Sequence, residues 1–324
     1  MKTLLAALAA ALTLAATAAT AQTAPAAWRA EWPATDFSRS SVEFAEILSG
    51  GPPKDGIPAI DAPAFQTVAA LSTRPADREP VISIEIGGQA RAYPVAILMW
   101  HEIVNDSFAG TPIAVTYCPL CNSGIVFDRR VGGEATTFGT TGKLRNSDLV
   151  MYDRASQSWW QQFEGRAIIG KHMGEELVRL PSRFEPFGEF AARHPDGEVL
   201  VASNRFGRSY GANPYEGYDS LRQPFLYDGA YDGPGEPLMR VVAIEGLPDA
   251  WSFAYVQAHA PFEVGGFRVE WQAGQASALD TRQISEGRDV GTVTVTMGGQ
   301  TAIYHVPFAF AFAAFNPGAT IFHD

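Results

Sequence analysis

Short runs of alternating hydrophobic and polar residues, separated by turn residues, make up most of the chain. Residues 81–86 (VISIEI) alternate, two glycines follow, and residues 90–93 alternate again, which predicts a β-hairpin. Residues 94–104 have helical spacing behind a proline, and residues 113–151 contain further short strand patterns separated by Gly, Asn and Asp. These patterns predict an α+β fold built predominantly of short antiparallel β-strands with a few helices.

Two stretches that lie far apart in the sequence resemble each other. Residues 85–98 (EIGGQARAYPVAIL) and residues 243–256 (AIEGLPDAWSFAYV) share one order of strand, turn and helix start. An internal duplication is one interpretation of this similarity. It predicts two pseudo-symmetric β-rich halves, at about residues 75–180 and 235–324.

Only one of the two predicted halves contains thiols. When a second pair of similar stretches is aligned, Cys118 corresponds to Gln272 and Cys121 corresponds to Gln275. If the duplication is real, the architecture itself does not need sulfur at this turn.

The N-terminus has the pattern of a secretory signal peptide. In residues 1–21, Lys2 precedes an apolar run, and Ala-Thr-Ala ends the segment, which predicts cleavage before Gln22. We therefore expect an exported protein, periplasmic or extracellular after cleavage. No later apolar run approaches the ~20 residues of a membrane span, so we expect none in the mature protein. Residues 22–74 are predicted to be a lead-in with short helices, followed by a domain at residues 75–324.

Composition and charge narrow the possible partners. Of 324 residues, 46% are hydrophobic, which excludes a disordered chain, and the formal net charge is −11. Nucleic-acid binding requires a basic surface, so no nucleic acid is expected as a partner.

The strongest chemical signal is the pair Cys118 and Cys121 in the stretch TYCPLCNS. Three interpretations remain open: a structural disulfide, a redox-active dithiol, and a metal site at a hairpin turn. A thioredoxin-like dithiol is disfavoured, because a strand pattern follows the second cysteine instead of a helix. A c-type haem is excluded, because Asn122 stands where that motif needs His. We predict that both cysteines lie at one hairpin turn.

A metal site at this turn needs further ligands, since two sulfurs do not complete a zinc or copper(I) site. His101 is the best candidate for the third ligand, because it stands shortly before the strand that leads to Cys118. The alternative is a histidine that only hydrogen-bonds a carbonyl at the end of a helix.

A second polar segment, residues 137–154, concentrates Arg145, Asn146 and Asp148 between apparent strands. Such a mixture of donors and acceptors suits a pocket for a small polar ligand. It suits equally a buried network of Arg–Asp pairs that ties strands together.

Four motifs together resemble the domain of unknown function 3179 (DUF3179) family. They are HEIVND (101–106), VTYCPLCNSGIVFDR (115–129), TFGTTGKLRNSDLVMYDR (137–154) and SWWQQFEG (158–165). The resemblance covers about residues 75–322 and implies a DUF3179-like domain in an exported or membrane-associated protein, without an assigned activity. It also implies the position of a site, at Cys118, Cys121, His101, Arg145, Asn146 and Asp148.

The sequence thus leads to two functional hypotheses. In the first, an exported protein uses its Cys-x-x-Cys site to bind a metal, zinc or copper, or to cycle between thiol and disulfide. Cys118, Cys121, Arg145, Asn146 and Asp148 are then the candidate catalytic residues. In the second, the chain is a non-catalytic ligand-binding or scaffold module with a structural disulfide.

Overall fold

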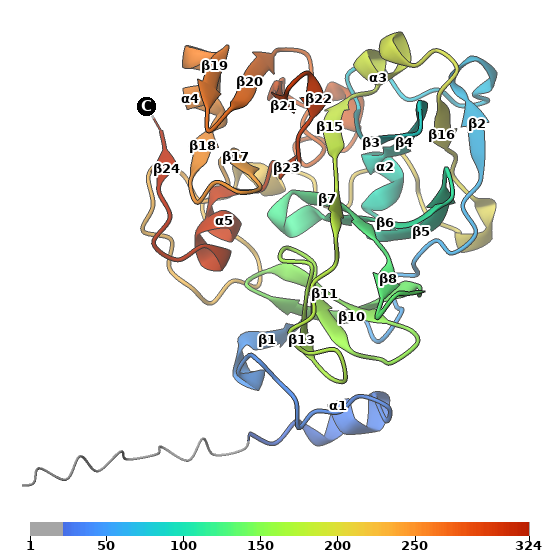
Figure 1. The fold of residues 1–324 in the computed structure, drawn as a ribbon, viewed down its shortest axis with the longest axis vertical. Helices are drawn as coiled ribbons and strands as arrows, with labels where there is room; N and C mark the ends of the chain where they lie inside the picture. Colours follow the sequence, from blue (N-terminus) through green and yellow to red (C-terminus); the bar gives the residue numbers. More distant parts are fainter. Residues whose placement is uncertain (1–21, 324) are drawn as a thin grey trace, which may run out of the picture.

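The computed structural model describes residues 22–323. The predicted signal peptide, residues 1–21, lies outside the described residues. The chain forms five sheets of four or five strands, arranged as a five-bladed β-propeller (Figure 1). The prediction of short, mostly antiparallel strands with a few helices is confirmed, since five short helices accompany the sheets in the described part of the chain. The arrangement is a ring of five sheets and not a simple α+β fold of two halves.

Three sheets are formed by strands from the first two thirds of the chain. The first, which we call the inserted sheet, has the order β1 (Ile47–Ser49), β10 (Phe138–Arg145), β11 (Asp148–Asp153), β12 (Trp159–Gln161) and β13 (Arg166–Ile169). The second, which we call the cysteine sheet because β6 ends at Cys118, has the order β14 (Arg179–Leu180), β7 (Ser123–Asp128), β6 (Thr111–Cys118) and β5 (Ile103–Phe108). The third sheet has the order β15 (Ser182–Pro186), β3 (Pro80–Ile86), β4 (Gln89–Pro94), β16 (Glu198–Leu200) and β2 (Phe65–Thr67).

Two further sheets come from the last third of the chain. One has the order β23 (Tyr304–His305), β17 (Val241–Ile244), β18 (Ala250–Ser252) and β24 (Ile321–Phe322). The other has the order β19 (Phe262–Val264), β20 (Phe267–Gln272), β21 (Thr292–Met297) and β22 (Gln300–Thr301). A separate two-stranded ribbon consists of β8 (Arg130–Val131) and β9 (Glu134–Ala135).

The helices are short and connect or cover the sheets. They are α1 (Ala26–Glu31), α2 (Val95–Leu98), α3 (Phe187–Arg193), α4 (Phe253–His259) and α5 (Ala309–Phe315). Single 3-10 turns are η1 (Phe44–Glu46), η2 (Val68–Ala70), η3 (Pro119–Cys121), η4 (Asn204–Phe206), η5 (Tyr218–Ser220) and η6 (Ile284–Glu286).

Two pairs of sheets repeat one plan. The orders β15-β3-β4-β16 and β23-β17-β18-β24 both combine a central antiparallel hairpin, an antiparallel outer strand and a parallel last strand. A helix of seven residues, α3 or α5, follows the outer strand in each. The orders β5-β6-β7-β14 and β19-β20-β21-β22 also correspond. We call residues 80–200 the first unit and residues 241–322 the second unit.

The inserted sheet has no counterpart in the second unit. Its strands β10 to β13 lie between β7 and β14 in the chain, whereas β21 and β22 are joined by a tight turn at Gly298 and Gly299. The lead-in contributes to this region, because β1 pairs with β10 along its edge. Within the lead-in, the structure has the short helical elements α1, η1 and η2 together with β1 and β2, which are edge strands.

The helix expected at residues 94–104 is wrong over most of its length. It ends after α2 at Leu98, and the chain turns at Glu102, which has a φ of 58°. Ile103 and Val104 then begin β5 and pair with β6. Both are β-branched residues that pack well on a pleated sheet, and this pairing overrides the helical spacing.

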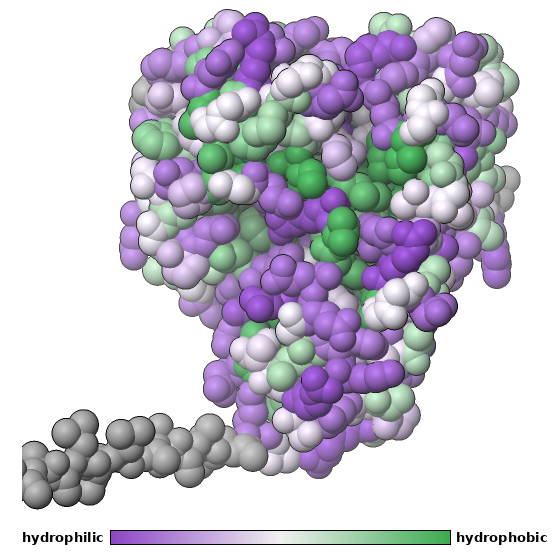
Figure 2. Space-filling model, in the orientation of Figure 1, coloured by the Kyte–Doolittle hydropathy of each residue, from purple (hydrophilic) through white to green (hydrophobic). Residues whose placement is uncertain are grey.

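The face seen in Figure 2 is mostly hydrophilic, with hydrophobic side chains gathered near its centre, where the sheets converge. One extensive core of buried hydrophobic residues includes members of all five sheets. Within residues 22–323, no helix has the length and apolar character that crossing a membrane requires.

Candidate functional site

Both cysteines lie at one hairpin turn, as the sequence predicted. Cys118 is the last residue of β6, and Cys121 ends η3, the single helical turn that connects β6 to β7. Asn122 then takes a left-handed conformation with a φ of 50°, which lets the chain reverse into β7. Both thiols are free, and neither side chain is accessible to solvent.

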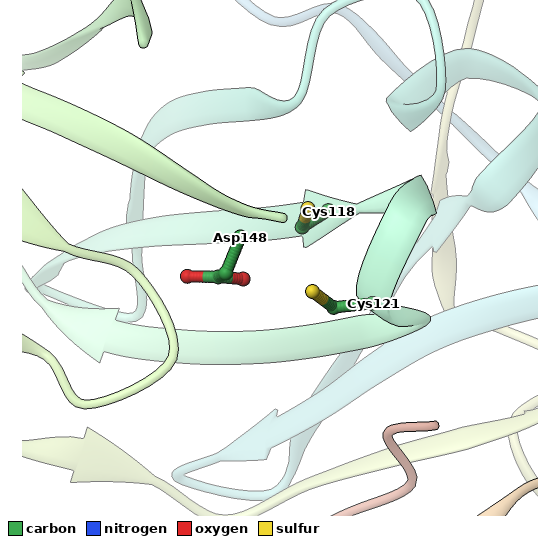
Figure 3. A group of neighbouring side chains, drawn as sticks. All are labelled: Cys118, Cys121 and Asp148. Carbon is green, nitrogen blue, oxygen red and sulfur yellow. The ribbon is translucent and has the colours of Figure 1, made fainter. Parts of the chain in front are cut away.

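Asp148 brings a carboxylate to the two sulfurs. It is the first residue of β11 and follows the turn residues Asn146 and Ser147, which have φ values of 51° and 64°. One ligand atom from each of Cys118, Cys121 and Asp148 lies within 4.8 Å of the other two, and all three residues are buried. Figure 3 shows the three side chains gathered between η3, the end of β6 and the start of β11. The insertion in the first unit therefore supplies the third donor.

The Asp148 carboxylate is held on one side only. Its Oδ2 accepts hydrogen bonds from Gln161 Nε2 at 2.6 Å and from the Phe163 N–H at 2.9 Å. Its Oδ1 is buried and accepts none within the described residues. One oxygen is thus fixed by the protein, and the other has no hydrogen-bond partner among the described residues.

Burial disfavours the charged forms of all three residues. It raises the pKa of both the Cys118 and the Cys121 thiols above the ordinary value. It also raises the pKa of Asp148 to about 7, although hydrogen bonds from Gln161 and the Phe163 N–H lower it. Without a cation, the site therefore keeps its thiols protonated.

Glu102 is a buried acidic residue that interacts electrostatically with this site and that was not expected from the sequence. Its residue is 7% exposed, and no hydrogen bond to its carboxylate is present in residues 22–323. Burial raises its pKa to about 8, and the negative charge of Asp148 adds to that shift. The HEIVND motif contained this residue, but a strand or helix pattern does not show that its carboxylate interacts electrostatically with Asp148 and Cys118.

His101 does not join the sulfurs, so the prediction that it is the third ligand is not supported. Its Nδ1 lies 2.7 Å from the carbonyl oxygen of Pro58, and its Nε2 lies 2.7 Å from the Tyr210 hydroxyl. The ring also stacks on Tyr210, with centroids 5.7 Å apart. Both nitrogens are engaged elsewhere, because the chain turns sharply at the next residue.

Arg145 and Asn146 lie at the end of β10 but contribute no side chain to the cluster. Arg145 Nε donates to Glu46 at 2.8 Å, and its guanidinium lies 3.7 Å from Glu164. Asn146 faces the site with its backbone, since its carbonyl oxygen is 3.9 Å from Cys121 Sγ. Of the residues expected in this polar segment, only Asp148 reaches the sulfurs.

A long irregular segment, residues 204–237, contacts the site. The Tyr218 hydroxyl donates to the carbonyl of Leu120, between the two cysteines, at 2.9 Å. Ser147 Oγ donates to the carbonyl of Phe225 at 2.5 Å. We call residues 204–237 the covering segment, because these contacts join it to the cysteine turn and to the residue before Asp148.

The model of the family described as "Protein of unknown function (DUF3179)" matches residues 54–319. The chain belongs to this family. No curated protein and no solved structure matches it.

Proposed function

We propose that this DUF3179 protein binds a zinc ion through Cys118, Cys121 and Asp148. The observation that carries the proposal is the cluster itself: three donor atoms lie within 4.8 Å of one another in a fully buried place. Buried polar groups are normally paired, whereas Asp148 Oδ1 has no hydrogen-bond partner in the described residues and the sulfurs form no disulfide. When bound, the ion would replace two thiol protons and act as a Lewis acid on whatever occupies its remaining position.

The donor set favours zinc over copper(I). Copper(I) prefers soft sulfur and imidazole ligands, whereas zinc accepts thiolate and carboxylate together. The third donor is the Asp148 carboxylate, and His101 is occupied by Pro58 and Tyr210. A two-residue spacing at a hairpin turn is also the usual arrangement of paired cysteine ligands in zinc sites.

A thiol–disulfide function is the second candidate, because both sulfurs are free and lie on one short turn. The raised pKa of the Cys118 and Cys121 thiols argues against it, since the thiolate is the reactive form. The turn also lacks a helix of several turns whose N-terminus would stabilise a thiolate, because η3 is a single turn followed by β7.

We also propose that the protein is exported and that its two units are copies of one ancestral unit. The pattern of residues 1–21 supports export. The matching strand orders support the duplication, as do α3 and α5, which have the same length and the same place after an outer strand. On this view, the first unit acquired both the thiols and the inserted sheet that provides Asp148.

One preparation distinguishes these functions. Protein purified from its native compartment is analysed for metal content by mass spectrometry and for thiols by titration under denaturing conditions, with and without reductant. Zinc binding predicts about one zinc per chain and two free thiols. A disulfide without metal would contradict the zinc proposal and support the redox or scaffold alternatives.

A further inference from the structure

The buried wall beside the three donor atoms contains unpartnered oxygen atoms. Within the described residues, Asp148 Oδ1, Ser123 Oγ, Gln161 Oε1 and Gln162 Oε1 are all buried and have no hydrogen-bond partner. Buried polar atoms in proteins are normally paired with protein groups or with ordered water. Several unpaired oxygens in one region therefore indicate that a hydrogen-bond donor is held there.

Contacts within the wall connect these oxygens to the cluster. Gln161 Nε2 donates to the Asp148 carboxylate at 2.6 Å. Gln162 Nε2 donates to Thr116 Oγ1 at 2.8 Å and to the carbonyl of Ser123 at 3.2 Å. Both amide nitrogens face acceptors, so the two amide oxygens, and not the nitrogens, are left without partners.

Ser123 stands on the same face of the sheet as Cys118. The two residues are directly opposite each other in the register of β6 and β7, and side chains of such a pair lie side by side. Ser123 Oγ is fully buried, yet it makes no bond that would explain a hydroxyl at this position.

We infer that the proposed zinc ion has an open fourth position, which holds a water molecule bonded to Ser123 and Gln162. The inference rests on the proposed zinc site and goes beyond it, because a structural zinc site is closed by four protein ligands. Three protein donors plus an exchangeable water are the arrangement of catalytic zinc sites. Ser123 and Gln162 are then positioning residues, which hold the water and do not touch the ion.

The charges favour a neutral donor over an anion at this position. Two thiolates and one carboxylate outweigh the charge of a zinc ion, and the surrounding oxygen atoms are acceptors. A water molecule can coordinate through its oxygen and donate both protons to the wall. The substrate class that could replace it is a small neutral molecule with O–H or N–H groups.

The test measures zinc affinity by competition with a chromophoric chelator, and zinc coordination by X-ray absorption. Ser123→Ala and Gln162→Leu are compared with the intact protein. Gln275→Leu is the matched control, because Gln275 is also buried with an unpartnered Oε1 but lies outside the cluster. Removing a partner of a zinc-bound group typically weakens zinc binding by about 10–100-fold.

We expect two sulfur and two oxygen ligands in the intact protein, and at least about tenfold weaker zinc binding in Ser123→Ala and Gln162→Leu. The control should bind as the intact protein does. Ser123→Ala is the cleaner variant, because Ser123 Oγ makes no hydrogen bond in the described residues that folding could lose. Its melting temperature without metal should therefore not fall.

Three results would overturn the inference. A fourth ligand from a protein side chain would show a closed site, and unchanged zinc affinity in both variants would remove the role of Ser123 and Gln162. In both cases the zinc proposal itself survives. Absence of zinc binding in the intact protein would refute the proposed function and the inference with it.

Discussion

In the first unit, β6 and β7 are joined by residues 119–122, a tight turn with one thiol directly before η3 and the other at its end. In the second unit, the corresponding strands β20 and β21 are joined by the much longer residues 273–291. The sulfurs of the first turn contact backbone carbonyls between β10 and β11 of the inserted sheet. The second loop is polar and places Ser277 and Arg288 around Asp219 of the covering segment.

On the proposed function, the first turn has a chemical role and the second loop has a supporting one. Asp219 has a fully buried side chain and is bonded by Arg240 at 2.8 Å, Ser277 at 2.5 Å and Arg288 at 2.8 Å. Its neighbour Tyr218 reaches across to the cysteine turn. The second unit therefore anchors the segment that covers the site of the first unit. The first hairpin carries the candidate site, and the loop of the equivalent hairpin holds the covering segment in place.

The largest effect is expected from removing both sulfurs. The double variant Cys118→Ser, Cys121→Ser should lose zinc binding completely while the fold persists, because Ser is nearly isosteric and a weak zinc ligand. Metal analysis and a thermal melt of the variant check this. Gln272→Ser, at the position equivalent to Cys118, is the control and should change neither. A melting temperature many degrees lower, in a protein that never held metal, would favour a structural disulfide.

Removing the anchor of the covering segment should be the next largest effect. Asp219→Asn leaves Arg240 buried without its counter-charge, and breaking such a pair costs about 3–5 kcal/mol. Chemical denaturation measures the loss, and alkylation of Cys118 and Cys121 should also accelerate. Asp280→Asn is the control. Asp280 pairs with Arg288, as Asp219 does, but its carboxylate is more exposed, so this variant should lose much less free energy of unfolding. Equal losses in the two variants would contradict the anchoring role.

The two units should also differ in how pH affects their stability, because β23 carries a histidine where β15 carries an arginine. His305 packs against Phe163 of the inserted region, with ring centroids 4.8 Å apart, whereas Arg183 on β15 is its counterpart by strand register. Burial, with a smaller contribution from Arg179, lowers the pKa of His305 to about 3. The unfolded chain takes up a proton below about pH 6.5 and the folded chain does not, so stability falls with acidification.

Because of this histidine, the free energy of unfolding should be about 2 kcal/mol lower at pH 5 than at pH 7.5. His305→Gln should remove that part of the acid sensitivity in denaturant melts at the two pH values. Arg183→Gln is the matched control, since Arg keeps its charge throughout this range. If His305→Gln and the intact protein lose stability in parallel, His305 is not the buried neutral group described here.

The smallest effect is expected from a single hydroxyl. Tyr218→Phe removes the hydrogen bond to the Leu120 carbonyl, worth about 1 kcal/mol, so the cover should open about fivefold more often. The rate of Cys118 and Cys121 alkylation in metal-free protein measures this opening. Tyr304→Phe removes a similar bond, to the Val293 carbonyl in the second unit, and should leave the alkylation rate unchanged. Equal rates in both variants would show that the covering segment does not control access.

Local features of this protein could be predicted from the sequence because they depend on neighbouring residues. The alternation at residues 81–93 correctly indicated the hairpin of β3 and β4, whose register pairs Ile86 with Gln89 across two glycines. The Pro-Leu pair between the cysteines, with strand patterns on both sides, correctly placed both sulfurs at one turn. The similarity of residues 85–98 to residues 243–256 corresponds to the matching hairpins and following helices of the two units.

The completion of the site was decided only by tertiary structure. Nothing in the local pattern distinguishes Asp148 from Arg145 or His101 as the neighbour of the sulfurs. The left-handed turn at Asn146 and Ser147 aims β11 at the cysteine sheet, and the sharp turn at Glu102 sends His101 to the covering segment. Such juxtapositions depend on how separate sheets pack, which residue spacing along one strand does not encode.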